Sequence, residues 1–104
     1  MKTSELTGAA LDWAVAKCEG VKLNEGNTLS NDCDVYSPST DWAQGGPIIE
    51  RKEIELVPKG MHWDAYADED FHVPYSGPTP LIAAMRCYVA SKLGDEVEIP
   101  EELK

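Results

Sequence analysis

Basic residues are scarce in this 104-residue sequence: nine Lys and Arg stand against nineteen Asp and Glu, and the formal net charge is −10. A protein that grips DNA or RNA by its phosphates needs clustered basic side chains, because these contacts release the counterions of the nucleic acid. The composition therefore argues against direct nucleic-acid binding, and also against docking on anionic lipid. The sequence also lacks a basic and apolar leader and any apolar run of the roughly 18–20 residues that a membrane span needs. We expect no association with a membrane.

Cysteine pairs and metal-ligand motifs are missing as well. Cys18, Cys33 and Cys87 are odd in number and widely spaced, and no Cys-x-x-Cys pair occurs. This usage is typical of free thiols in a reducing, cytosolic compartment, so we expect no disulfide. His62 and His72 stand ten positions apart, outside any spacing typical of a metal site. The sequence predicts no metal ligands.

The motifs of common catalytic sites do not occur either. There is no Gly-x-Ser-x-Gly elbow, and the acidic residues around Cys33 would raise the pKa of its thiol rather than activate it. Gly45, Gly46 and Pro47 suggest a phosphate cradle, but the Gly-Lys-Ser/Thr that completes such a loop does not follow. We therefore predict no catalytic residues, no cofactor and no enzymatic activity.

The first predicted helix covers residues 8–18, with Thr7 as its cap and Gly20 as its stop. At 3.6 residues per turn its aliphatic side chains form one stripe, and Asp12 falls on the opposite face. Trp13 belongs to neither face and lies beside Lys17. Its ring either packs under a neighbouring loop or is presented to a partner or a planar ligand.

The second predicted helix covers residues 81–93. Thr79 is its cap, Pro80 takes the first position and Gly94 ends it. Only Arg86 and Lys92 are charged across this range, so the helix is apolar nearly all round and must be covered on more than one side. The second cover is either the first helix or another subunit. For the second case, a homo-oligomer, the candidate interface residues are Trp13, Ala83, Cys87 and Ala90.

The rest of the chain reads as short strands and turns. Alternation over 54–66 predicts a hairpin, and residues 21–23 and 33–36 could pair as two short strands. One helical turn is expected at 41–43, a short helix at 47–52 after a reversal at Gly45-Gly46, a loop at 68–78 and a last strand at 96–99. These elements favour an α+β fold, with two main helices packed on a small, mostly antiparallel sheet. We assign residues 1–99 to a single domain and residues 100–104 to an acidic tail.

A candidate anion pocket lies at the start of the second helix, where backbone N–H groups have no helical partners. Gly77 and Thr79 would form it, and the turn around Asp41 and Trp42 could supply an aromatic wall. Gly45 and Gly46 complete the candidate ligand-binding set. The alternative is that a small domain uses its large aromatic side chains in its only core.

Two blocks of the sequence resemble the NinX-like proteins of lambdoid phages and prophages. They contain the motifs Gly8-Ala9-Ala10-Leu11-Asp12-Trp13 and Gly77-Pro78-Thr79-Pro80-Leu81-Ile82. The stretch Tyr36-Ser37-Pro38-Ser39-Thr40-Asp41-Trp42 lies between them and is similar too. The resemblance covers roughly half the chain and does not extend to residues 51–75. It implies a small phage early-region protein working in the cytoplasm of the infected bacterium. It implies no activity, because the family is one of unknown function.

Four hypotheses about function are consistent with these features of the sequence. The first is a non-catalytic protein that binds a host or phage protein and self-associates, as the apolar second helix suggests. The second is a binder of a small, nucleotide-like ligand that counters host defence, which the first turn of that helix and the Trp residues suggest. Charge alone motivates the third, an acidic mimic of DNA, and an enzyme ranks last.

Overall fold

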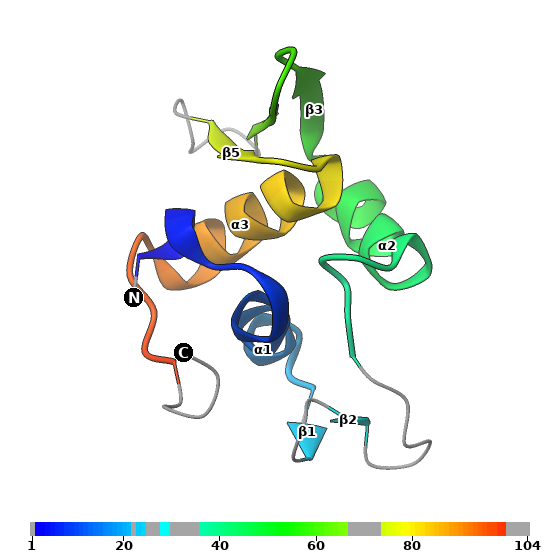
Figure 1. Cartoon of the computed structure of the whole chain (residues 1–104). Helices are drawn as coiled ribbons and strands as arrows, with labels where there is room; N and C mark the ends of the chain where they lie inside the picture. Colours follow the sequence, from blue (N-terminus) through cyan, green and yellow to red (C-terminus); the bar gives the residue numbers. More distant parts are fainter. Residues whose placement is uncertain (1, 22, 25–27, 30–35, 67–73, 100–104) are drawn as a thin grey trace.

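The computed structural model describes residues 2–21, 23–24, 28–29, 36–66 and 74–99. Three α-helices and a three-stranded antiparallel sheet make up most of this part of the chain. The helix α3 (Pro80–Leu93) runs between the sheet on one side and the helix α1 (Gly8–Glu19) on the other, while α2 (Trp42–Lys52) lies beside the start of α3 (Figure 1). The predicted α+β class is confirmed, and a third helix is added to the two main ones that were expected.

The helix α1 follows its local signals. Thr7 is the extended N-cap residue, although its side chain makes no capping hydrogen bond, and Gly20 ends the helix in the left-handed region at φ 72°. The face opposite the aliphatic stripe is also buried, since Asp12 is only 5% exposed and Ala16, on the same face, only 2%. Both residues are covered, so the buried surface of α1 extends beyond its aliphatic stripe.

The helix α3 is the centre of the core. Nine of its fourteen residues are buried, and it contacts α1, α2 and all three strands of the sheet. The prediction that this helix is covered on more than one side is therefore confirmed. The cover comes from the chain itself, with α1 against one flank and the sheet against the other (Figure 1).

The sheet has the order β3-β4-β5, with β3 at Glu55–Pro58, β4 at Trp63–Tyr66 and β5 at Tyr75–Gly77. The first two strands confirm the predicted hairpin, and β5 pairs with β4 where a loop was expected. Tyr75–Gly77 was assigned to a loop because Gly and Pro surround it, but contacts with distant residues stabilise this segment as a strand. The Arg86 guanidinium donates through Nη1 to the Ser76 carbonyl oxygen at 2.8 Å and through Nε to the Leu6 carbonyl oxygen at 2.7 Å. Arg86 thereby joins the edge of β5 and the N-terminal segment to α3.

The helix α2 corrects the predicted turn, reversal and short helix at 41–52. One continuous helix runs through Gly45 and Gly46 and holds Pro47 in its interior. Pro47 removes one backbone hydrogen bond, and its ring crowds the residue before it. Here that residue is Gly46, which has no Cβ, and both Ala43 and Pro47 are exposed, so water can reach the carbonyl left without its donor.

The remaining pairings are short. Leu23–Asn24 (β1) pairs with Thr28–Leu29 (β2). The expected pairing of residues 21–23 with 33–36 falls partly on residues 22 and 33–35, which lie outside the described part. The expected strand at 96–99 is reduced to a single bridge between Glu96 and Lys2, next to the 3₁₀ turn η1 (Thr3–Glu5). The acidic residues 68–70 and the tail 100–104 lie outside the described residues.

Candidate functional site

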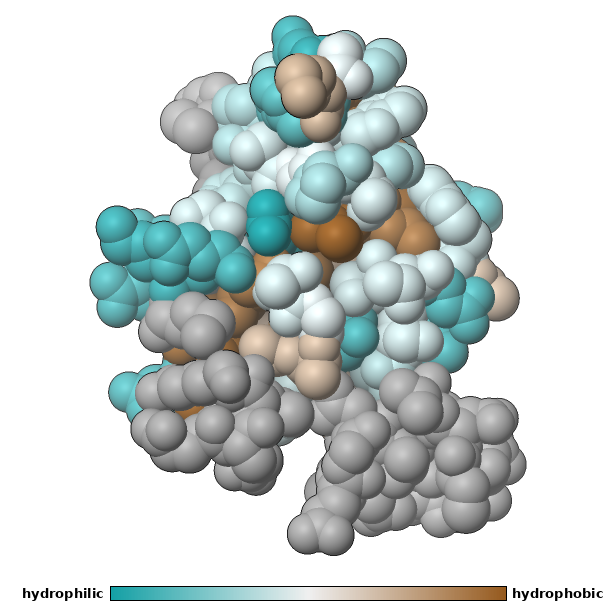
Figure 2. Space-filling model, viewed as in Figure 1, coloured by the Kyte–Doolittle hydropathy of each residue, from teal (hydrophilic) through white to brown (hydrophobic). Residues whose placement is uncertain are grey.

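A pocket lies where the first turn of α2 meets the first turn of α3. Its volume is about 200 Å³, and its lining comes from two segments far apart in the sequence. The lining residues are Ser39, Thr40, Trp42, Thr79, Pro80, Leu81 and Ile82. On the face drawn in Figure 2, apolar surface is exposed near the centre, over the region between α3 and the segment that leads into α2, and paler, more polar residues surround it. The structure therefore brings Trp42 and Thr79 of the predicted ligand-binding set to one pocket.

The α3 side of the pocket is fixed by capping. Thr79 has extended backbone, and its Oγ1 accepts a hydrogen bond from the Ile82 N–H at 3.2 Å. Pro80 occupies the first turn, where a missing N–H is harmless. The Leu81 N–H also belongs to this turn and has no partner within the helix. The Thr79 hydroxyl is thus occupied in holding the helix end.

The α2 side of the pocket presents Trp42. Asp41 is the N-cap residue, and its Oδ1 accepts from the Ala43 N–H at 2.9 Å while its Oδ2 accepts from Gln44 Nε2 at 3.2 Å. These bonds fix the first helical position, Trp42, whose side chain remains 53% exposed. Both carboxylate oxygens of Asp41 therefore serve the helix end, and Asp41 is not part of the pocket lining.

The three glycines of the predicted set do not line the pocket. A Cβ at Gly45 would lie 2.4 Å from the Pro38 carbonyl oxygen and 2.6 Å from Leu81 Cδ2. A Cβ at Gly77 would lie 2.7 Å from the backbone nitrogen of Ala83. These two glycines allow backbone segments to approach closely beside the pocket, whereas Gly46 has only Trp42 Cε3 near its Cβ position, at 3.9 Å.

The predicted interface residues lie elsewhere. Ala83 and Cys87 are completely buried and Ala90 is 3% exposed, so all three belong to the chain's own core. Trp13 is half-buried against the core, with the Lys17 ammonium 5.3 Å from the centre of its ring. The apolar second face of α3 is thereby accounted for by contacts within one chain. Neither Cys18 nor Cys87 forms a disulfide, and burial raises the pKa of Cys18 to about 11.

A buried carboxylate supports the segment that leads into α2. The Ser39 N–H donates to Asp12 Oδ1 at 2.9 Å, which ties this segment to α1. Burial raises the pKa of Asp12, and hydrogen bonding from Ser39 opposes the rise. Helical periodicity placed Asp12 on the polar face, and no local signal in the sequence reveals its partner.

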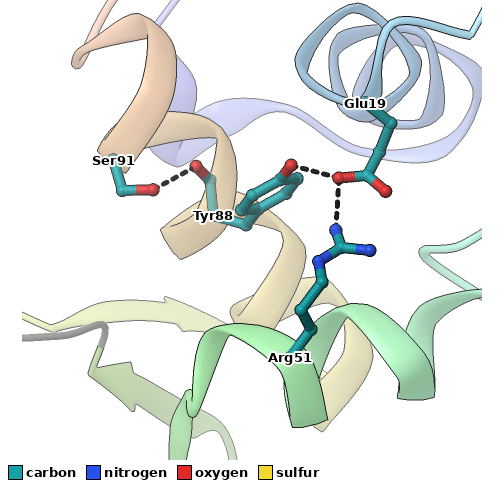
Figure 3. Close-up of polar contacts among 4 residues, drawn as sticks. All are labelled: Glu19, Arg51, Tyr88 and Ser91. Carbon is teal, nitrogen blue, oxygen red and sulfur yellow. Dashed lines mark hydrogen bonds and ion pairs between the residues drawn. The ribbon is translucent and has the colours of Figure 1, made fainter.

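A second polar cluster joins the C-terminal ends of α1 and α2 to the middle of α3 (Figure 3). Glu19 of α1 accepts from the Tyr88 hydroxyl of α3 and from Arg51 of α2, with 2.6 Å between Arg51 Nη2 and Glu19 Oε2. The Lys52 ammonium lies 5.8 Å from the centre of the Tyr88 ring. Partial burial opposes ionisation of Glu19, but the bonds from Tyr88 and Arg51 prevail and lower its pKa. Sequence reasoning missed this cluster, because its members are far apart in the chain.

The described part of the chain has neither a membrane-spanning helix nor a cluster of metal ligands. No helix there is long and apolar enough to cross a membrane. Nor do its His, Cys, Asp and Glu side chains gather in a group of three or more that could hold a metal ion.

Comparison with known families places the chain among bacteriophage proteins. The family model described as bacteriophage P22, NinX matches residues 2–92, which include α1, α2, α3 up to its last residue but one, and both sides of the pocket. The chain belongs to this NinX family of phage proteins, as the sequence resemblance indicated. No curated protein matches the sequence.

Proposed function

We propose that this phage protein is a non-catalytic binding protein that acts on a host or phage protein in the cytoplasm of the infected bacterium. The pocket beside Trp42 is its contact site. The observation that carries the proposal is a large aromatic side chain left 53% exposed at the edge of an apolar hollow.

The exposure of Trp42 is energetically significant. A Trp side chain buries roughly 150–250 Å² when it is covered, so its open half amounts to on the order of 100 Å². Covering that area on binding is worth roughly 2–3 kcal/mol. Trp residues are enriched among the few side chains that carry most of the binding energy of protein interfaces. Trp42 therefore has the properties of such a residue.

The size of the pocket favours a side chain of a protein partner over a whole small molecule. Its volume is about 200 Å³, whereas sites for small molecules and cofactors usually measure about 300–1,000 Å³. The net charge of −10 favours partners with a basic surface, because it accelerates encounters with them. A basic protein that inserts an apolar side chain beside Trp42 meets both conditions.

The chemistry of the lining also favours binding over catalysis. Its polar side-chain groups are the hydroxyls of Ser39, Thr40 and Thr79 and the indole N–H of Trp42, and Thr79 Oγ1 already accepts the capping bond from Ile82. A general base needs a pKa near the working pH, and hydroxyls lie far from it. The lining thus offers shape and apolar contact, with no acid, base or metal ligand of its own.

A second candidate is the nucleotide-like ligand. The Trp42 ring could stack on a base while the first turn of α3 faces an anionic group. Any ligand that binds the native state raises its stability, by about 2.7 kcal/mol at a hundredfold excess over Kd. A thermal-shift screen with nucleotides tests this candidate, and it fails if none of them raises the Tm.

Site-specific photo-crosslinking in infected cells tests the main proposal. A photoreactive amino acid replaces Thr40, which is exposed in the pocket lining, and in a control chain it replaces Glu55, which is exposed on β3. We expect a host or phage protein other than this chain to be crosslinked at position 40 and not at 55, and the yield to fall when Trp42 is also changed to Ala. Equal products at both positions, or none at 40, would contradict the proposal.

A further inference from the structure

Two large apolar side chains are exposed in the described part of the chain: Trp42 at 53% and Met61 at 96%. Trp42 borders a pocket, while Met61 projects from the tip of the β3–β4 hairpin. A Met side chain is unbranched and flexible, fills irregular gaps and is frequent at adaptable binding surfaces. The chain therefore carries both an apolar hollow and an apolar side chain of a kind that fits one.

The hairpin turn holds Met61 outward. The Lys59 N–H donates to the His62 carbonyl oxygen at 2.9 Å, and the Met61 N–H donates to the Lys59 carbonyl oxygen at 3.2 Å. Gly60 has φ 85°, a left-handed conformation that a side chain would strain. In Figure 1 the turn between β3 and β4 lies at the end of the hairpin that is far from α1 and α3. Met61 is 96% exposed and is not part of the pocket lining, so it does not occupy the pocket of its own chain.

We propose that Met61 of a second copy of this chain occupies the pocket beside Trp42. The inference rests on the same pocket as the proposed function and names a further occupant of it. In the absence of another partner, self-association would cover Trp42, and a partner protein would have to displace Met61. This basis for self-association is independent of the buried face of α3.

One pair of charges is complementary between the two surfaces. Lys59 is exposed next to Met61 at the hairpin tip. Asp41 adjoins Trp42 at the pocket and keeps its negative charge while its oxygens cap α2. The residues that line the pocket carry no charge, so no cation among them opposes Lys59.

Long-range electrostatics act in the opposite direction. Each copy has a net charge of −10, so two copies repel each other, and salt screens this repulsion. The contact is also small, since it consists of one inserted side chain and its surroundings. We therefore expect weak association that strengthens with salt.

Sedimentation equilibrium of the purified full chain between about 0.05 and 1 mM tests this inference, at salt concentrations of about 0.05 and 0.5 M. We expect the average mass to exceed that of a monomer at the upper concentrations, more so at high salt. Met61→Ser and Trp42→Ala should each lower the association constant about tenfold or more. Met61→Leu should retain it, and Lys59→Glu should weaken it. Circular dichroism confirms that each variant folds.

A mixture of two variants provides the specific test. Met61→Ser keeps the pocket and Trp42→Ala keeps Met61, so a labelled sample of the first should bind the second more tightly than either binds itself. A wild-type chain that stays monomeric at both salt concentrations would overturn the inference, as would association that Met61→Ser leaves unchanged. Crosslinking of another protein at position 40 does not depend on Met61, so these results leave the proposed function to its own test.

Discussion

The substitution Gly45→Ala tests the close packing that places the two sides of the pocket. Gly45 is buried in α2, and a Cβ added to it would lie 2.4 Å from the Pro38 carbonyl oxygen and 2.6 Å from Leu81 Cδ2. Leu81 could move aside, but the Pro38 oxygen belongs to the backbone of a segment that Asp12 ties to α1 through Ser39. The added methyl group must therefore push α2 away from this segment.

The expected loss of stability follows from two opposing effects. Overpacking a well-filled site costs about 1–3 kcal/mol, and a backbone clash at this distance belongs near the upper end. Replacing Gly by Ala inside a helix recovers about 0.8–1 kcal/mol. The net loss is about 2 kcal/mol, which lowers the Tm of a domain of this size by roughly 8–16 °C.

The neighbouring substitution Gly46→Ala is the matched control. Its Cβ would meet only Trp42 Cε3, at 3.9 Å, which is ordinary contact. The substitution gains helix propensity, but residue 46 precedes Pro47, and a Cβ is disfavoured in a helical residue before proline. The stability of the variant should therefore stay within about 1 kcal/mol of wild type. Thermal and urea unfolding measure both variants. Equal Tm values for the two, or a Gly45→Ala variant more stable than wild type, would refute the described packing.

Four further predictions concern the cap of α3, the hydroxyl of Tyr88 and two carboxylates. Thr79→Ala should cost about 0.5–2 kcal/mol in urea unfolding while Thr79→Ser costs little, and equal losses would show that the hydroxyl does not cap α3. Tyr88→Phe should cost about 1–2 kcal/mol, because it removes a hydrogen bond to a carboxylate. The pKa of Glu19 is lowered from 4.5, so the stability it contributes is present above that pH and is lost as the pH falls. Glu19→Gln should therefore flatten the acid limb of a Tm–pH curve, and an unchanged limb would contradict this. The pKa of Asp12 is raised from 3.8, so its ionisation costs stability as the pH rises through the native pKa. Asp12→Asn should remove that loss and leave the Tm at neutral pH equal to or above wild type; a lower value would show that the charge itself is needed.

Local signals in the sequence predicted the main helices and the hairpin. The Thr79-Pro80 start and the Gly94 end of α3 act within one or two turns, so no tertiary contact is needed to locate them. The sparse charge of the same helix also indicated correctly that it is covered on more than one side. Such features depend on residues that are neighbours in the chain.

Features that depend on distant partners were not predictable. Pro47 favours the start of a helix, yet α2 continues through it because Gly46 and exposed surroundings make this tolerable. The strand β5 exists because β4 pairs with it and Arg86 binds the Ser76 carbonyl oxygen. Neither partner can be identified from the residues around β5.

The candidate site was predictable only in part, because some of its features depend on neighbouring residues and others on distant segments of the chain. Capping chemistry and an unusual Asp41-Trp42 pair singled out both sides of the pocket, and the structure brings Trp42 and Thr79 together. The role of Gly45 depends on which segment approaches it, and only the fold reveals that Pro38 does. The same holds for the contact between Glu19 and Tyr88, which joins α1 to α3.

One measurement tests most directly whether Trp42 is a contact for a protein partner. The protein crosslinked at position 40 is purified, and its affinity for the wild-type chain and for Trp42→Ala is measured by titration calorimetry. We predict that the variant loses at least about tenfold in affinity, while its Tm stays near that of the wild type because about half of Trp42 is already exposed. Equal affinities for the two chains would contradict the account.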